Sequence, residues 1–170
     1  VPLIDAGADG KGVFAAAEGQ WPVVGIKLHA GVWINSADHE RLDGSVGTDQ
    51  NYGLYLTIDG HVASTAWNLR AGFANDKVSQ ASQFLSAALE HPLANSTLGL
   101  GVAHTGLSSQ DATPQQDDIL QAEAYLRFSP REDVSVTPAV QWLSNSGFDA
   151  SSNTVDAEQI LFSLRLNYTF

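Results

Sequence analysis

Polar, charged and aromatic side chains recur at every second position in several segments of this 170-residue chain. Residues that alternate in this way lie on one face of a β-strand. Charged and amide groups can bind hydroxylated solutes, and aromatic rings offer flat surfaces for sugar-like rings. The alternative for each such residue is that it only solvates a wall of strands or pairs with a neighbour. The candidate substrate-binding residues are Lys27, His29, Trp33, Tyr55, Asp59, Arg70, Glu123, Tyr125, Arg127, Gln141 and Arg165.

Nucleophilic catalysis would need a serine, a histidine base and an orienting carboxylate or amide within hydrogen-bond reach. His104 is close in sequence to Ser108 and Ser109, which keeps a barrel lipase as one alternative. The chain has no GxSxG motif, and the alternation of its strand places His104 on the apolar side. The sequence therefore predicts no catalytic residue and no enzyme.

A transition-metal site would need closely spaced histidines, cysteines or carboxylates. The chain has no cysteine, and its five histidines show no HxxxH or similar spacing. We therefore predict no metal site and no cofactor. The histidines are His29, His39, His61, His91 and His104.

Composition excludes several classes of protein. The net charge of -11 argues against a nucleic-acid partner, because no basic patch could displace phosphate counterions. No run reaches the roughly 18 apolar residues of a membrane helix, which says nothing about membrane strands. Without cysteine there is no disulfide framework, so the redox compartment cannot be inferred from cysteine usage.

Period-two alternation of apolar and polar residues dominates the chain and predicts an all-β, antiparallel meander of about nine strands. Residues 80–91 have the least regular pattern, and Phe84–Ala88 could also form a helical turn. A tight turn is expected at Gln20–Pro22, and residues 1–10 are expected to be a lead-in. The strands are predicted at residues 11–19, 23–35, 51–61, 66–75, 80–91, 96–105, 118–128, 133–143 and 159–170.

The last of these segments is the most informative. Its alternation is broken only by Leu161 and continues to the aromatic Phe170. Strands of soluble proteins usually have about 5–6 residues, whereas a membrane-spanning strand needs roughly 9–11. This length favours a transmembrane strand over an ordinary buried C-terminal strand.

Two further features distinguish a membrane barrel from a lipocalin-like soluble barrel. Short connections mostly alternate with long polar ones, such as 36–50, 106–117 and 144–157, as in outer-membrane barrels. The polar face combines glycine with charge, which suits a water-filled lumen. Aromatic residues at strand ends resemble the girdles of a membrane barrel, namely Trp21, Tyr52, Trp67, Phe128, Trp142, Tyr168 and Phe170. A lipocalin-like ligand-binding barrel remains the soluble alternative.

Acidic residues are concentrated in the polar loops. Carboxylates there could hold Ca²⁺ through oxygen ligands, although no EF-hand spacing is present. We expect them to be solvated or to bind divalent cations that bridge lipopolysaccharide. They are Asp38, Glu40, Asp43, Asp49, Asp111, Asp117 and Asp118.

Strand parity bears on domain organisation. Bacterial single-chain barrels have an even number of strands, with both ends on the short-turn side, whereas nine strands are counted here. Two alternatives are therefore predicted for residues 1–170. Either two of the nine segments are one strand and the chain is a single β-barrel domain with eight strands, or the chain is the C-terminal part of a larger barrel. The glycine and alanine on the inward face favour the second option, because a closed eight-stranded barrel fills its lumen with side chains.

Five short stretches resemble the carbohydrate-selective porin (OprB-like) family of Gram-negative outer membranes, and they follow the order of that family. They are Trp33-Ile34-Asn35 before the acidic loop, Asn51-Tyr52-Gly53-Leu54-Tyr55, Leu98-Gly99-Leu100-Gly101-Val102-Ala103, Thr137-Pro138-Ala139-Val140-Gln141 and Arg165-Leu166-Asn167-Tyr168-Thr169-Phe170.

The resemblance implies a transmembrane β-barrel of sixteen strands in the outer membrane, of which this chain is the C-terminal part. It implies passive diffusion of small hydrophilic solutes, sugars above all, through a water-filled channel. The partners then expected are outer-membrane lipid, lipopolysaccharide and the barrel-assembly machinery, which would recognise the strand ending at Phe170. A homotrimer and a monomer both remain open. No sugar-binding residue of the family can be placed on this chain.

Overall fold

The computed structural model describes residues 3–6, 12–110, 118–131, 133–145 and 158–169. Within this part of the chain all regular structure is β-strand, and no helix is long and apolar enough to span a membrane. The strands are β1 (Leu3–Ala6), β2 (Val13–Val23), β3 (Ile26–Glu40), β4 (Thr48–Val62), β5 (Thr65–Ala74), β6 (Ala81–Leu93), β7 (Ser96–Leu107), β8 (Ile119–Arg131), β9 (Val134–Leu143) and β10 (Gln159–Tyr168).

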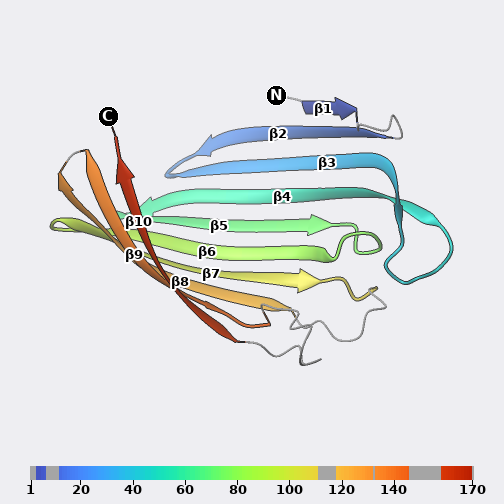
Figure 1. The fold of residues 1–170 in the computed structure, drawn as a ribbon. Helices are drawn as coiled ribbons and strands as arrows, with labels where there is room; N and C mark the ends of the chain where they lie inside the picture. The colour runs from blue at the N-terminus through green and yellow to red at the C-terminus, as the bar shows by residue number, and fades with distance from the viewer. Residues whose placement is uncertain (1–2, 7–11, 111–117, 132, 146–157, 170) are drawn as a thin grey trace.

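The strands form one 10-stranded sheet in which each strand pairs only with its neighbours in sequence. All nine pairings are antiparallel, which confirms the predicted meander. Strands β1 and β10 are the two edges of the sheet and do not pair with each other. Figure 1 shows the sheet curving so that β10 crosses in front of the ends of the middle strands.

The lengths of the connections show at which rim each strand begins and ends. The links after β2, β4, β6 and β8 are short, whereas those after β1, β3, β5, β7 and β9 are longer. Strand β1 was not predicted, because it lies in the segment expected to be a lead-in. With β1 included, the count is even, and the start of β1 and the end of β10 lie on the same, short-turn rim.

One local prediction was wrong. The tight turn expected at Gln20–Pro22 lies instead at Val24–Gly25, where Gly25 has a positive φ of 78°. Proline is tolerated in β2 because β1 covers that strand only as far as Ala16, so Pro22 lies on its unpaired edge. The strand predicted at residues 80–91 is confirmed, because Phe84–Ala88, for which a helical turn was the alternative, is part of β6 and is paired on both sides.

The register divides the strand residues into two faces, because residues directly opposite each other in an antiparallel pair point to the same side. Val32 pairs with Leu54, and Leu54 pairs with Phe73, on what we call the apolar face. Lys27 pairs with Asp59, and Asp59 pairs with Asn68, on the polar face. The alternation in the sequence is therefore continued from strand to strand around the sheet.

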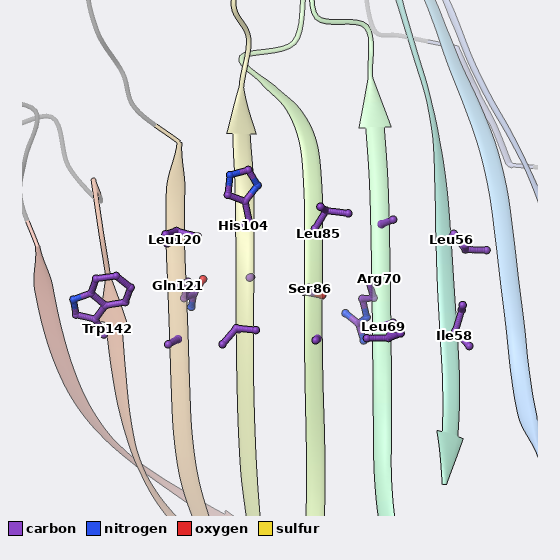
Figure 2. A pocket seen from close by; sticks show the side chains of 15 residues that line it. Leu56, Ile58, Leu69, Arg70, Leu85, Ser86, His104, Leu120, Gln121 and Trp142 are labelled. Atoms are coloured by element: carbon purple, nitrogen blue, oxygen red, sulfur yellow. The ribbon is translucent and has the colours of Figure 1, made fainter. Parts of the chain in front are cut away.

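The sheet has no dry core. No hydrophobic side chain of the described residues is buried, and Leu54, Leu100 and Leu164 on the apolar face are 50%, 42% and 72% exposed. Figure 1 looks into the hollow of the sheet, whereas Figure 2, in which the strands follow in the reverse order, looks onto its outer side. The apolar residues line a shallow groove of about 660 Å³ on that outer side, across β4 to β9.

The expected aromatic girdles also lie on the apolar face. Trp21, Trp67, Phe128 and Tyr168 pair with residues of that face near the short-turn rim. Tyr52 and Trp142 do so toward the long-loop rim. Phe170 lies outside the described residues. The apolar face is therefore bordered by aromatic rings at both rims, as the outer face of a membrane barrel would be.

Candidate functional site

The polar face brings the predicted residues onto one surface. Lys27 and Asp59 are opposite each other on β3 and β4, as are Thr57 and Arg70 on β4 and β5. Glu123 and Gln141 are opposite each other on β8 and β9. All eleven candidates fall on this face in the register, and their part in binding a solute stays a prediction.

Only some of the candidates are close together. A groove of about 460 Å³ runs between the side chains of β4 to β8 on the polar face. It gathers four candidates, Asp59, Arg70, Glu123 and Tyr125, together with Glu90, which the sequence had not singled out. The candidates outside this groove are Lys27, His29, Trp33, Tyr55, Arg127, Gln141 and Arg165.

The acidic candidates are bonded to amide neighbours. Asn68 donates from Nδ2 to Asp59 Oδ1 at 2.7 Å, and Gln141 donates from Nε2 to Glu123 Oε2 at 2.6 Å. His29 Nε2 lies 3.8 Å from Asp59 Oδ2. The two hydrogen bonds run between neighbouring strands and hold the carboxylates against the polar face of the sheet.

On the polar face of the N-terminal strands, one tyrosine side chain lies flat across the neighbouring strand. Tyr55 of β4 reaches over Gly31 of β3 and donates its hydroxyl hydrogen bond to Glu18 of β2. We call this arrangement the first Glu–Gly–Tyr bracket. Sequence reasoning missed Glu18, although it occupies an alternating position in its strand.

A second bracket repeats the arrangement four strands further on. Tyr125 of β8 reaches over Gly99 of β7 and donates its hydroxyl hydrogen bond to Glu90 of β6. Arg127 Nη2 donates to Glu90 at 2.8 Å and to the Tyr125 hydroxyl at 3.3 Å. The Arg127 guanidinium lies 5.6 Å from the centroid of the Tyr125 ring, within the range of a cation–π contact.

Trp33 is held by aromatic packing instead of a polar bond. Its ring stacks on Phe14 with centroids 6.1 Å apart and an interplanar angle of 25°. It also covers Gly53 of β4, where a Cβ would come within 2.7 Å of the indole. The Trp33 ring therefore lies against the polar face of the sheet, near the long-loop rim.

Charge on the polar face is balanced. Apart from residues at the long-loop rim, the charged residues of the described strands on this face are the basic Lys27, Arg70, Arg127 and Arg165 and the acidic Glu18, Asp59, Glu90 and Glu123. Among the described residues, the side chains of Lys27, Arg70 and Arg165 have no hydrogen-bond or ion-pair partner. The net charge of -11 is therefore carried elsewhere, largely in the loops.

The loop predicted at residues 36–50 is shorter in the structure, because Asp38 and Glu40 lie in β3 and Asp49 lies in β4. Among the described residues the expected loop acids form no cluster that could hold a metal ion. Asp49 lies 3.4 Å from Lys77 Nζ, and Asp118 lies 3.0 Å from His104 Nε2. Asp111 and Asp117 lie outside the described residues. His104 is on the apolar face, and the Ser108 hydroxyl donates to the carbonyl of Asp76 instead of to a histidine. His104 and Ser108 therefore do not form the serine–histidine pair that a lipase would need.

Among the described residues outside the strands, Asp43 in the loop between β3 and β4 is the acid whose pKa departs clearly from its ordinary value. The Ser45 hydroxyl and amide donate to Asp43 at 2.6 and 2.9 Å, and Arg41 Nη2 donates at 3.1 Å. These bonds hold the pKa of the Asp43 carboxyl below its ordinary value. The loop conformation is therefore favoured above that ordinary value, about 4, and lost as pH falls through the lowered pKa.

We expect the Ser45 amide resonance to move toward a random-coil position on acidification below about pH 4. NMR of the detergent-folded protein would measure the shift. The Asp43→Asn variant, which cannot titrate, is the control. A resonance that moves equally in the variant and in the wild type would contradict the assignment.

No family model matches the chain, and no curated protein matches it in sequence. The structure is similar to the high-pH structure of OprB from Pseudomonas putida, with a TM-score of 0.80 and 15% sequence identity. The match covers 96% of this chain and 50% of that one, so the chain spans about half of its length. The likeness confirms the predicted antiparallel barrel architecture, and the fold is that of about one half of an OprB-like porin.

Proposed function

We propose that this chain forms part of the wall of an outer-membrane porin through which small hydrophilic solutes, saccharides among them, diffuse passively. The observation that carries the proposal is the two-sided sheet. Its apolar side is exposed across the whole width, and its polar side is lined by bonded side chains. A soluble lipocalin-like barrel would place the apolar face in a dry interior, which the exposure of Leu54 and Leu100 opposes.

The two edges of the sheet that lack a partner strand indicate how the barrel is closed. Unpaired N–H and C=O groups cost several kcal/mol each in hydrocarbon, so only closed barrels span a membrane as strands. The outer edges of β1 and β10 have no partner strand here, and the similar OprB structure is about twice as long. We infer that residues 1–170 are the C-terminal part of a barrel whose other strands pair with these edges. The total of sixteen strands stays a prediction.

A balanced, hydrogen-bonded wall suits neutral, hydroxylated solutes. Carboxylates and amides offer acceptors and donors, and the Tyr55, Tyr125 and Trp33 rings offer apolar faces beside them. Such a wall can exchange hydrogen bonds with a sugar without holding it tightly, as conduction requires. The proposed partners are outer-membrane lipid, lipopolysaccharide and the barrel-assembly machinery, with a homotrimer as one assembly.

The decisive experiment is conductance of the full-length, detergent-folded protein in a planar bilayer, with and without added sugars. We expect discrete conductance steps that decrease when sugar occupies the channel. The absence of channels, together with folding in water without detergent, would favour the lipocalin-like alternative. Hydrolysis of a lipid ester that is lost on replacing one serine would favour a barrel lipase.

A further inference from the structure

The two brackets share a feature that depends on glycine. A Cβ atom built on Gly31 would overlap the ring and hydroxyl of Tyr55, and one built on Gly99 would overlap the ring of Tyr125. Each ring therefore lies on the bare backbone of the strand that it crosses. A strand glycine is otherwise unfavourable, because it has no side chain to pack and loses more backbone entropy on folding.

Gly53 on the same face also lies under a ring, that of Trp33, but Gly72 and Gly101 do not. A Cβ on Gly72 would lie 3.8 Å from the Phe84 Cβ, and one on Gly101 would lie 3.8 Å from the Ala88 Cβ. Both are ordinary van der Waals contacts. On the polar face a ring therefore approaches the backbone closely at Gly31, Gly53 and Gly99, and the rings over Gly31 and Gly99 are the ones bonded to a glutamate.

The glutamate at the far end of each bracket keeps the ring in place. A tyrosine on a strand can adopt more than one χ1 rotamer, and a ring standing away from the sheet would project into the lumen. A hydrogen bond to a carboxylate is stronger than one between neutral groups. It spans two strand spacings of about 4.8 Å each, which requires the side chain to lie across the intervening strand.

We propose that each Glu–Gly–Tyr bracket sets the local width of the channel, with the glutamate holding the tyrosine ring flat over the glycine. This inference rests on the proposed porin function. The second bracket is reinforced, because Arg127 bonds both Glu90 and the Tyr125 hydroxyl. In the first bracket Thr57 stands two residues after Tyr55, where the second has Arg127.

The test uses the second bracket in the full-length protein. Gly99→Ala forces the Tyr125 ring away from the wall and should lower the single-channel conductance. Adding Tyr125→Ala removes the ring and should restore the conductance to the wild-type value or above it. This dependence of one substitution on the other is a double-mutant cycle. An equal loss from Gly99→Ala with and without the ring would overturn the proposal.

Gly101→Ala is the matched control, since it adds the same methyl group to the same strand and face without meeting a ring. We expect its conductance to equal that of the wild type. A loss as large as that of Gly99→Ala would show that alanine in this strand, and not the displaced ring, narrows the channel.

A second readout does not depend on conduction. Nitration of Tyr125 by tetranitromethane, followed by mass spectrometry, reports how accessible the ring is. We expect increased nitration in Gly99→Ala and in Glu90→Ala, but not in Gly101→Ala. If this nitration pattern appears but the wild type forms no channel, the proposed porin function is wrong, whereas the arrangement of the Tyr125 ring over Gly99 is supported. If nitration of Tyr125 is unchanged in both Gly99→Ala and Glu90→Ala, the proposed role of the bracket is wrong, whatever the conductance shows.

Discussion

Replacing Leu100 with arginine is expected to destabilise the membrane-folded protein by about 2–4 kcal/mol, the cost of a cation at the lipid-facing midplane of a barrel. Leu100 lies near the middle of β7 on the apolar face, between Leu89 and Ala124, and is 42% exposed. Urea denaturation of the full-length protein folded in phospholipid vesicles would measure the loss.

Ala103→Arg is the control for this prediction. Ala103 is on the same strand but on the polar face, between Ser86 and Gln121. An arginine there would extend into water, so the free energy of unfolding should change little. If the two variants lose stability equally, or if Ala103→Arg loses more, the assignment of the two faces is wrong.

Arg70→Glu is expected to make the channel more selective for cations. Arg70 lies in the polar groove without an ion-pair partner, so the substitution changes the charge of the wall by two units without breaking a bond. One unit charge acting across water at about 4 Å is worth about 1 kcal/mol, or a factor of about five, so this change of two units should raise the cation-to-anion permeability ratio by at least about fivefold. Reversal potentials in a potassium chloride gradient would show the shift.

Arg131→Glu makes the same change in net charge at the short-turn rim, where Arg131 is 74% exposed in its side chain. Screening by salt over about 10 Å at 0.1 M should leave the reversal potential almost unchanged. A shift as large as that of Arg70→Glu would mean that overall charge, and not the wall, sets the selectivity.

The strands were the most predictable part of the structure. Where a strand has apolar residues on one side and polar ones on the other, as in β3 and β10, period-two alternation is sufficient to assign both strand and face. Strand β6 was harder, because Phe84 lies on the polar face and breaks the pattern. Strand β1 has only 4 residues, too few for a pattern to emerge.

The brackets could not be predicted from the sequence. Their formation depends on the register, which brings Glu18, Gly31 and Tyr55 together across three strands. Alternation states which face a residue is on, but not which residue of the next strand is opposite it. Glu18 and Glu90 were accordingly absent from the candidate residues, whereas both tyrosines were among them.

The recurrence of the bracket has a consequence for how such walls arise. Its glutamates, glycines and tyrosines are separated by 72, 68 and 70 residues respectively, a nearly constant offset of four strands. A gene segment encoding two hairpins, once duplicated in tandem, would produce this offset. Since four is even, each further copy would preserve both the inside–outside alternation and the rim on which the last strand ends. Barrels of larger circumference could then be reached by whole-hairpin insertion.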